Sequence, residues 1–313
     1  MTTDTVGVYL SKDHLDAHRM SDGAIHRFAN DSGSHRAFMD WLVRCGTVDD
    51  MRIVYEPTGA YYRAFERRLA AAALVKVNPR QAQRFTEATG KLAKTDRLDA
   101  AMLARMGALL ELEARPARSP ILDDLKDLHT AREALVKNRT AARNRAKNLT
   151  LPVLKRHNAE QLRQIERQMA AIEREILELI TADPDLARRF DILVSIPGVS
   201  AITAFALLID MPELSTLAQG QAAALAGLAP VARQSGTWIG RAFIRGGRAT
   251  VRQALYMPAL VAMRFNPDLK AKYDQLKAAG KASKVAIAAI MRKLVVLANA
   301  LLRQGRIWQP TLT

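Results

Sequence analysis

The sequence predicts an α/β domain at the N-terminus, a pair of long helices in the middle and a mainly α-helical domain at the C-terminus. Three observations predict this order. Short β-branched runs alternate with helical patterns before about residue 118, apolar residues recur every three or four positions through the middle, and a small-residue helix follows a Pro-Gly turn further on. Because 313 residues exceed the usual size of one compact domain, we expect three parts, residues 1–118, 119–186 and 187–313.

The first part shows strands alternating with helices. Thr5–Leu10 is β-branched and apolar, and Arg52–Tyr55 is a second short apolar run. Ala60–Ala73 has helical spacing, Leu74–Val77 is typical of another strand, and a polar helix is expected from about Arg80, after an Asn-Pro break. Such alternation is typical of an α/β domain.

The middle part has the periodicity of two long helices, interrupted at Pro152. Glu and Arg separate the apolar positions of the second helix with a heptad-like spacing, which favours an antiparallel hairpin or a dimerising coiled coil. A simple helical spacer is the alternative. The apolar positions are Leu125, Leu128, Leu135, Leu162, Ile165, Met169, Ile172, Ile176 and Leu179.

The strongest compositional signal is positive charge. The chain has 47 Lys and Arg residues against 31 Asp and Glu residues, a net charge of +16 and a pI near 10.3. Cations that neutralise phosphates release counterions, so this excess favours salt-sensitive attachment to DNA or RNA. A merely basic soluble protein, or one that binds anionic membranes, is the alternative.

Cysteine content and hydropathy indicate a cytoplasmic protein. Cys45 is the single cysteine, which excludes an intramolecular disulfide and a cysteine-based zinc site, and we expect it in the core. No uninterrupted apolar run reaches the roughly 18 residues that span a bilayer, and the polar start Met1–Asp4 lacks the features of a signal peptide.

A Pro-Gly turn precedes the small-residue helix expected over Ala201–Ile209. The stretch Leu193–Ser200, with Pro197 and Gly198 at its turn, resembles a helix-hairpin-helix, in which backbone N–H groups and a helix N-terminus contact a phosphate. We expect Pro197 and Gly198 to contact nucleic acid. A turn between two packed helices would have the same sequence.

Three carboxylates are candidates for a metal site. Glu56 directly follows the strand Arg52–Tyr55, at the strand end where α/β folds commonly place functional groups. Asp96 and Asp99 lie three residues apart, so a helix would present both on one face. Converging carboxylates suit a hard cation and phosphoryl transfer. Exposed acids, and capping of a helix by Thr95 with Asp96 in its first turn, are the alternatives.

Long motifs resemble the DEDD transposases of the insertion-sequence 110 family, which include Piv-like DNA invertases. In the first half, VGVYLSKD, YEPTGAY, VNPRQAQRF and KTDRLDAAMLA are similar to the family's blocks and occur in the same order. In the second half, SIPGVSAITA and GLAPVARQSGTWIGRAFIRGGRATVRQAL are similar to its C-terminal domain. The resemblance covers nearly the whole chain.

The resemblance implies a RuvC-like, RNase H-type first domain, a coiled-coil connector and a C-terminal domain with a catalytic serine, here Ser235. It implies that Glu56, Asp96 and Asp99 bind Mg²⁺ or Mn²⁺. It further implies a bacterial DNA recombinase that acts on element ends and target DNA, is guided by a structured noncoding RNA and assembles as a dimer to tetramer with composite sites.

One position departs from the family pattern. The family has an aspartate within its first strand, and this chain has Tyr9 at that place. A phenol is neutral near pH 7 and bulkier than a carboxylate, so it does not simply replace an anionic metal ligand. Asp13 lies four residues further on, beyond the expected strand, and is a weak candidate substitute.

Basic residues in two segments are candidates for contacts with the phosphate backbone of a nucleic acid. Four of them, Arg233, Arg241, Arg245 and Arg248, are also near enough to Ser235 in sequence to stabilise charge on a phosphate. With aromatic residues at only 5%, phosphate contact is favoured over base stacking. A solvated helix face is the alternative for each of them. The candidates are Lys137, Arg139, Arg143, Arg145, Lys147, Arg233, Arg241, Arg245, Arg248 and Arg252.

Two other functions remain open from the sequence. The first is a RuvC-like junction nuclease, in which water attacks the phosphate and Ser235 is structural. The second is a non-catalytic nucleic-acid-binding relative, which Tyr9 favours because it removes the first acid.

Overall fold

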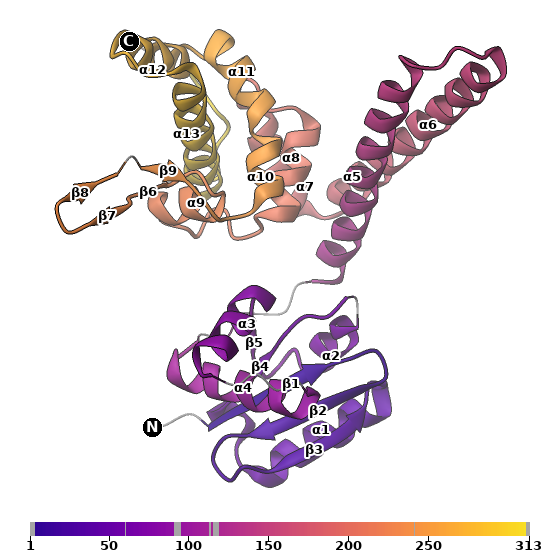
Figure 1. The fold of residues 1–313 in the computed structure, drawn as a ribbon, viewed down its shortest axis with the longest axis vertical. Coiled ribbons are helices and arrows are strands. Elements are labelled where there is room, and N and C mark those ends of the chain that lie inside the picture. Colours follow the sequence, from indigo (N-terminus) through magenta and orange to yellow (C-terminus); the bar gives the residue numbers. More distant parts are fainter. Residues whose placement is uncertain are drawn as a thin grey trace. The chain divides into compact units, whose positions relative to one another are not determined.

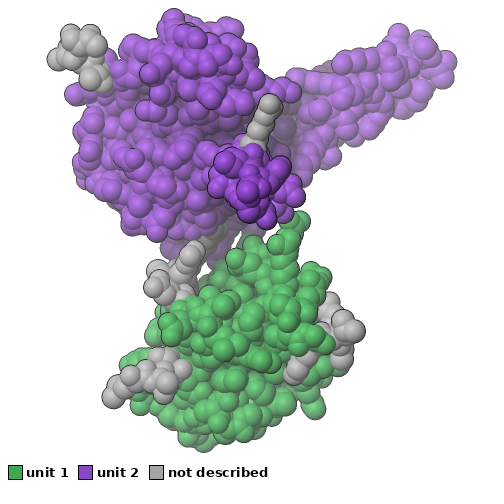
Figure 2. Space-filling view, turned by 60° about the vertical axis from the view of Figure 1, so that its left-hand side comes forward, with its two compact units in different colours: residues 1–118 green, residues 119–313 purple. Residues whose placement is uncertain are grey.

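The chain divides into two compact units, residues 1–118 and residues 119–313 (Figure 2). The computed structural model describes residues 4–59, 61–90, 95–112, 114, 119–240 and 242–310.

The first unit is built on a mixed sheet in the order β3-β2-β1-β4-β5 (Figure 1). The strands β1, β2 and β3 form antiparallel pairs, whereas β4 is parallel to β1 and β5 is parallel to β4. The carboxyl ends of β1 and β4 therefore meet at one edge of the sheet. The strands are β1 (Asp4–Leu10), β2 (His14–Arg19), β3 (Ile25–Ala29), β4 (Met51–Tyr55) and β5 (Ala73–Lys76).

Helices cover both faces of this sheet. On one face, α1 (Ser32–Cys45) and α2 (Tyr62–Arg68) pack on a core that includes Val6, Val8 and Ile53. On the other face, α4 (Asp96–Leu109) lies across β1, β2 and β4, with α3 (Pro79–Ala88) beside it. Side chains of a strand alternate between faces, so Gly7 and Tyr9 of β1 face α4. A short 3-10 helix, Val48–Asp50, leads into β4.

Gly7 of β1 lies very close to the backbone of α4. A Cβ atom on Gly7 would lie 2.0 Å from the carbonyl oxygen of Ala100 and 2.3 Å from the backbone nitrogen of Ala104. Gly107 further along α4 makes a similar contact, because its Cβ would lie 2.3 Å from Val54 Cγ2. Only glycine fits at this depth, so α4 rests directly on the backbone of β1.

The α/β character of the first unit is confirmed, with some elements missed. The predicted strands Thr5–Leu10, Arg52–Tyr55 and Leu74–Val77 correspond to β1, β4 and β5 within a residue at each end. The helix predicted over Ala60–Ala73 is shorter, because α2 ends at Arg68 and β5 begins at Ala73. The sequence analysis did not identify β2, β3 or α1. Cys45 is free and partly buried against the core.

The second unit begins with an antiparallel hairpin of α5 (Pro120–Ala146) and α6 (Pro152–Ala182) (Figure 1). Ion pairs join the two helices, with Arg132 Nε 2.7 Å from Glu173 Oε1 and an Arg143–Glu166 pair at 2.9 Å. Both helices start with proline at their first position, where the missing N–H has no intrahelical partner anyway. The predicted pair of long helices separated at Pro152 is confirmed.

The base of the hairpin shares a hydrophobic core with the C-terminal helices. Leu125, Ile176 and Ile180 are fully buried in that core, and Lys126 Nζ lies 2.6 Å from Asp210 Oδ1. Residues 119–313 form one compact unit. The further division of this unit that we expected at residue 186 therefore stays a prediction. The helices are α7 (Pro184–Val194), α8 (Ala201–Asp210), α9 (Gln219–Leu225), α10 (Ala249–Ala254), α11 (Tyr256–Phe265), α12 (Pro267–Ala278) and α13 (Ser283–Gln304).

The central helix of this core is α13, which buries Ile290, Leu294 and Val295. Among the described helices, only α13 has the length and mean hydropathy of a membrane-spanning segment, and 56% of its most apolar window is buried inside the unit. Arg292 and Lys293 interrupt it, which is why the sequence has no uninterrupted apolar run of that length. Its burial identifies α13 as a core helix.

A narrow two-stranded arm extends from these helices (Figure 1). At its base β6 (Pro230–Val231) pairs with β9 (Phe243–Ile244), and at its tip β7 (Gln234–Ser235) pairs with β8 (Trp238–Ile239). The strands are too short to give a periodic pattern, and the sequence analysis did not predict the arm.

The contact at Gly7 gives a test of the fold. We expect Gly7→Ala to lower the free energy of unfolding of the first unit by at least about 2 kcal/mol, because the new methyl group overlaps the backbone of α4. Urea-dependent hydrogen exchange of the β1 and β4 amides measures this loss. Gly33→Ala is the matched control, since its Cβ meets only Asp31 at 3.4 Å, and its effect should stay below about 1 kcal/mol. Equal effects of the two substitutions would contradict the close contact.

Candidate active site

Strand register places Tyr9 and Glu56 side by side. In the parallel pair of β1 and β4, Val8 is opposite Tyr55, so Tyr9 and Glu56 are the next residues along the two strands. Both belong to the face that α4 covers, because they lie two residues beyond Gly7 and Val54. Glu56 is partly buried at the end of β4.

The N-terminus of α4 brings Asp96 and Asp99 to the same edge. Thr95 caps the helix, with its hydroxyl accepting a hydrogen bond from the Leu98 N–H at 3.3 Å, and both aspartates lie in the first turn. Negative charge is favoured there by the helix dipole. Since Gly7 contacts Ala100 and Ala104, the preceding turn of α4 lies toward the carboxyl end of β1, where Tyr9 is.

The charges of all three acids act on the phenol of Tyr9. Burial raises the pKa of the Tyr9 phenol above its usual value, and the nearby charges of Asp96, Asp99, Glu56 and Asp16 raise it further. A hollow of about 570 Å³ beside it is lined by Tyr9, Glu56 and Asp99. The structure therefore brings together the three acids that the sequence singled out, with the phenol of Tyr9 among them.

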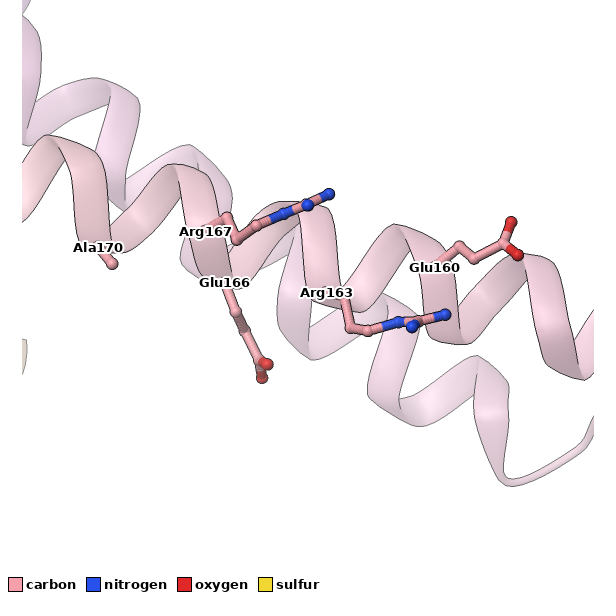
Figure 3. Close-up of a pocket in the computed structure, with 5 residues that line it drawn as sticks. All are labelled: Glu160, Arg163, Glu166, Arg167 and Ala170. Atoms are coloured by element: carbon pink, nitrogen blue, oxygen red, sulfur yellow. The ribbon is translucent and has the colours of Figure 1, made fainter.

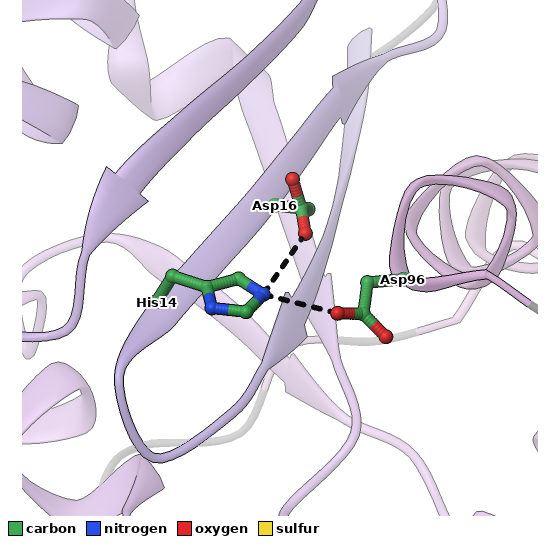
Figure 4. Close-up of side chains that lie close together, drawn as sticks. All are labelled: His14, Asp16 and Asp96. Atoms are coloured by element: carbon green, nitrogen blue, oxygen red, sulfur yellow. Dashed lines mark hydrogen bonds and ion pairs between the residues drawn. The ribbon is translucent and has the colours of Figure 1, made fainter.

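A fourth carboxylate, which the sequence analysis missed, lies on the neighbouring strand. Asp16 of β2 is fully buried, and its carboxylate accepts hydrogen bonds from Arg27 Nε at 2.9 Å and from a second Arg27 nitrogen at 2.7 Å. His14 Nε2 lies 3.5 Å from Asp16 Oδ2 and 3.0 Å from Asp96 Oδ2 (Figure 4). Together, His14, Asp16 and Asp96 could hold a metal ion.

The candidate substitute named from the sequence, Asp13, lies elsewhere. It is exposed in the turn between β1 and β2 and is not among the charges that raise the pKa of Tyr9. The alternation in His14–Ala17 could have identified Asp16 instead, because a four-residue connection after Leu10 pairs Leu10 with Leu15 and Tyr9 with Asp16.

The donor set fits a divalent cation. Carboxylate oxygens are the ligands that hard cations prefer, and the four acids near Tyr9 come from strand β2, the end of strand β4 and the first turn of helix α4. Arg27, which pairs with Asp16, offsets part of their mutual repulsion. The cluster is therefore suited to neutralising charge on a bound phosphate through a cation.

Ser235 lies in the second unit, at the tip of the arm. It is paired with Trp238 across the two-residue turn Gly236-Thr237, and Gly236 has a positive φ of 55°. The tip is exposed, with Trp238 53% and Ile239 79% accessible. The turn thus presents the Ser235 hydroxyl on a narrow, solvent-accessible hairpin.

Comparison with known proteins decides the family. The DEDD_Tnp_IS110 transposase model matches residues 6–158, and the model of the IS116/IS110/IS902 transposase family matches residues 190–274. Together they cover about three quarters of the chain. This chain belongs to the IS110 family of DNA transposases. It is a DNA transposase/recombinase, as the resemblance in the sequence motifs predicted.

Individual relatives agree with this assignment. The chain is 28% identical to the pilin gene-inverting protein of Moraxella bovis, over 98% of both chains, and to the same extent to that of Moraxella lacunata. It is 30% identical over 162 residues to the 43.6 kDa protein of insertion element IS110 from Streptomyces coelicolor, which covers 51% of this chain and 39% of that one. DEDD transposases typically use a divalent metal ion, with which the acidic cluster is compatible.

The arginines in and near the arm of the transposase differ in their contacts with the rest of the protein. Arg248 makes two hydrogen bonds to Glu213, at 2.6 and 2.7 Å, and Arg252 donates to the Gly246 carbonyl at 2.8 Å, so both hold the base of the arm. The Arg233 guanidinium lies 6.0 Å from the centre of the Trp238 ring. Arg245 is exposed. Arg241 lies outside the described residues.

The cations of the helical hairpin are mostly exposed. Lys137 and Lys147 are exposed and Arg139 is partly buried, whereas Arg143 pairs with Glu166 and Arg145 donates to Gln161 at 3.2 Å. Along α6, two glutamates alternate with two arginines around a hollow of about 630 Å³ (Figure 3). That balanced face is not suited to a polyanion, so α5 carries the better candidates for DNA contact.

The Pro-Gly turn has a packing role. A Cβ on Gly198 would lie 2.8 Å from the Pro258 carbonyl oxygen, so the turn is pressed against α11. Ser200 caps α8 through the Thr203 N–H, and Gly198 also lines a groove of about 440 Å³ with Arg139 and Ser200. Contact of Pro197 and Gly198 with nucleic acid stays a prediction.

The different engagement of Arg248 and Arg245 can be tested. We expect Arg248→Ala to destabilise the second unit by about 1–2 kcal/mol, because it removes charged hydrogen bonds to Glu213. Arg245→Ala should change stability by less than about 0.5 kcal/mol but lower the salt dependence of DNA binding by about one released ion. Thermal unfolding and fluorescence anisotropy over a salt series measure the two effects. The reverse pattern would show that Arg248 is the DNA contact.

Proposed function

We propose that this transposase cuts and rejoins the DNA strands of an insertion sequence through Ser235, with Mg²⁺ or Mn²⁺ held by the acidic cluster. The observation that carries the proposal is geometric: strand register places Glu56 beside Tyr9 at the end of β1, and Asp99, which shares the first turn of α4 with Asp96, lines the same hollow. Three carboxylates that converge beside a strand end are the arrangement that a phosphoryl-transfer site requires.

The topology of the first unit supports a RuvC-like, RNase H-type domain. Three antiparallel strands followed by two parallel strands, in the order β3-β2-β1-β4-β5, give the sheet arrangement of that fold class. Acids at the ends of the central strands β1 and β4 and at a helix terminus fit the same class. The Pro-Gly turn of the second unit would act as its helix-hairpin-helix, and the α5–α6 hairpin as its coiled-coil connector.

The proposed reaction is a transfer of a DNA phosphate to serine. The Ser235 hydroxyl gives up its proton, its oxygen bonds to phosphorus, and the bond from phosphorus to one sugar oxygen breaks. That sugar oxygen takes a proton and leaves as a hydroxyl, so one strand end remains linked to Ser235 as a phosphodiester. Attack by the hydroxyl of another strand reverses the step and joins the new pair of ends.

The arm does not contain the base for this reaction. Residues 230–245 include no Asp, Glu or His, so the group that accepts the Ser235 proton comes from outside the arm. A divalent cation, when bound, supplies charge neutralisation at the phosphate. The exposed cations Arg233 and Arg245 would stabilise the same phosphate from the side of the arm.

The partners follow from charge and family. A net charge of +16 suits DNA and a structured guide RNA, the latter implied by the family resemblance. We propose assembly as a dimer to tetramer, in which the acids and the arm act on one phosphate. The junction nuclease remains the alternative in which water attacks, and Tyr9 favours a third candidate, a relative that binds nucleic acid without cutting it.

A covalent-adduct assay tests the proposal. The substrate is DNA spanning the gene for this chain and its flanks, with RNA transcribed from those flanks and either Mg²⁺ or Mn²⁺. We expect a protein–DNA adduct on a denaturing gel that disappears in Ser235→Ala, because the oxygen that bonds to phosphorus is gone. Thr237→Ala, which removes a hydroxyl from the same turn, should keep the adduct within about threefold.

Other outcomes separate the alternatives. Strand cleavage that persists in Ser235→Ala without any adduct would identify the junction nuclease. An adduct formed only by Tyr9→Asp would show that this copy binds nucleic acid but lacks one catalytic acid. DNA binding without cleavage in any of these variants would leave the non-catalytic relative as the function.

A further inference from the structure

The register of the first hairpin places a carboxylate opposite Tyr9. In the antiparallel pair of β1 and β2, Tyr9 is directly opposite Asp16. Side chains of directly opposed residues lie on the same face, with Cβ atoms about 5 Å apart. Asp16 of β2 therefore faces α4, as Tyr9 of β1 does. In the family pattern, the first acid stands at the position of Tyr9.

The surroundings of Asp16 are those of a functional acid. Its side chain is fully buried, although an ionised carboxylate is costly to remove from water. The charge is compensated on one side by Arg27, whose side chain is 49% exposed. On the other side it faces His14 and, beyond it, Asp96 (Figure 4).

We propose that Asp16 supplies the carboxylate that Tyr9 lacks, and that a divalent cation binds between Asp16 and Asp96 with His14 as a third ligand. The inference rests on the proposed metal-dependent function. It changes the membership of the site, because the first acid comes from β2 instead of β1.

The distances among the donors fit one ion. Ligands about 2.1 Å from a cation lie about 3.0 Å apart when adjacent in an octahedron and about 4.2 Å apart when opposite. His14 Nε2 is 3.0 Å from Asp96 Oδ2 and 3.5 Å from Asp16 Oδ2, and the three donor atoms all lie within 4.8 Å of one another. A small inward movement of the side chains would bring all three donor atoms within bonding distance of one ion.

The donor types favour manganese. His14 contributes an imidazole nitrogen, whereas Mg²⁺ prefers oxygen ligands and Mn²⁺ accepts both. We therefore expect this site to bind Mn²⁺ more tightly than Mg²⁺. The raised pKa of the Tyr9 phenol is consistent with the same concentration of negative charge, to which Asp16 contributes.

Arg27 has opposite roles in the two explanations of Asp16. If Asp16 only forms a structural ion pair with Arg27, loss of either partner should change metal binding to the same extent. If Asp16 is a ligand, Arg27 positions its carboxylate but also repels the cation, since the guanidinium lies 3.9 Å from Asp96 Oδ2. Removing Arg27 should then leave metal binding intact or strengthen it.

The experiment is a titration of the full chain with Mn²⁺, followed by the loss of the free-ion signal in electron paramagnetic resonance. We expect Asp16→Asn to weaken Mn²⁺ binding at least tenfold and Arg27→Gln to leave it unchanged or up to tenfold tighter. In the Asp16→Asn background, Tyr9→Asp should restore affinity to within about threefold of the unaltered chain, because the carboxylate returns to the same face from β1. Circular dichroism checks the fold of each variant.

Several results would overturn the inference. Mn²⁺ binding that is unaffected by Asp16→Asn but lost in Asp99→Asn would leave the acidic cluster as a metal site without Asp16. Binding seen only after Tyr9→Asp in the otherwise unaltered chain would show that Asp16 does not compensate. If Asp16→Asn fails to fold, weak binding by Arg27→Gln would likewise count against Asp16 as a ligand. Absence of binding in both the unaltered chain and Tyr9→Asp would refute the proposed metal-dependent function itself.

Discussion

The direct contact between α4 and the backbone of β1 at Gly7 is the constraint on which the acidic site depends. With no side chain at Gly7, the helix lies close enough for its first turn to reach the end of β1, where Glu56 also emerges from the parallel neighbour β4. A larger residue would push α4 outward and separate Asp96 and Asp99 from Tyr9, Glu56 and the hairpin. The positions of the acids are thus set by the packing contact at Gly7, two residues before Tyr9 on β1.

In the proposed reaction the chemistry would be divided between the two units, and neither unit alone would hold all the groups that strand transfer needs. The first unit gathers carboxylates, and the described residues that line the hollow beside Tyr9 include no serine. The second unit presents Ser235 on an arm without an acid or a histidine. On this proposal, the attacking group would be separated from the groups that neutralise the charge of the phosphate. Cleavage would then require a nucleic-acid complex that unites them, which guards against cutting by the protein alone.

Much of this arrangement could be predicted from the sequence, and the rest could not for identifiable reasons. The strands β1 and β4 are buried and β-branched, and the α5–α6 hairpin has a long helical period, so their patterns are clear. By contrast, β3 is an exposed edge strand, and β2 buries the polar Asp16 in place of an apolar residue. The two-residue strands of the arm are too short for any periodicity. The compensating acid was missed because register, rather than composition, places Asp16 opposite Tyr9.

The most direct test of this account is the position of a metal ion in crystals of the transposase grown with Mn²⁺, located by anomalous scattering. The account predicts one strong peak about 2.2 Å from carboxylate oxygens of Asp16 and Asp96 and from His14 Nε2. A peak held by Glu56 and Asp99 alone, with Asp16 still paired to Arg27, would contradict it. In that case the first acid would be missing from the site, and Tyr9 would mark a copy with impaired chemistry.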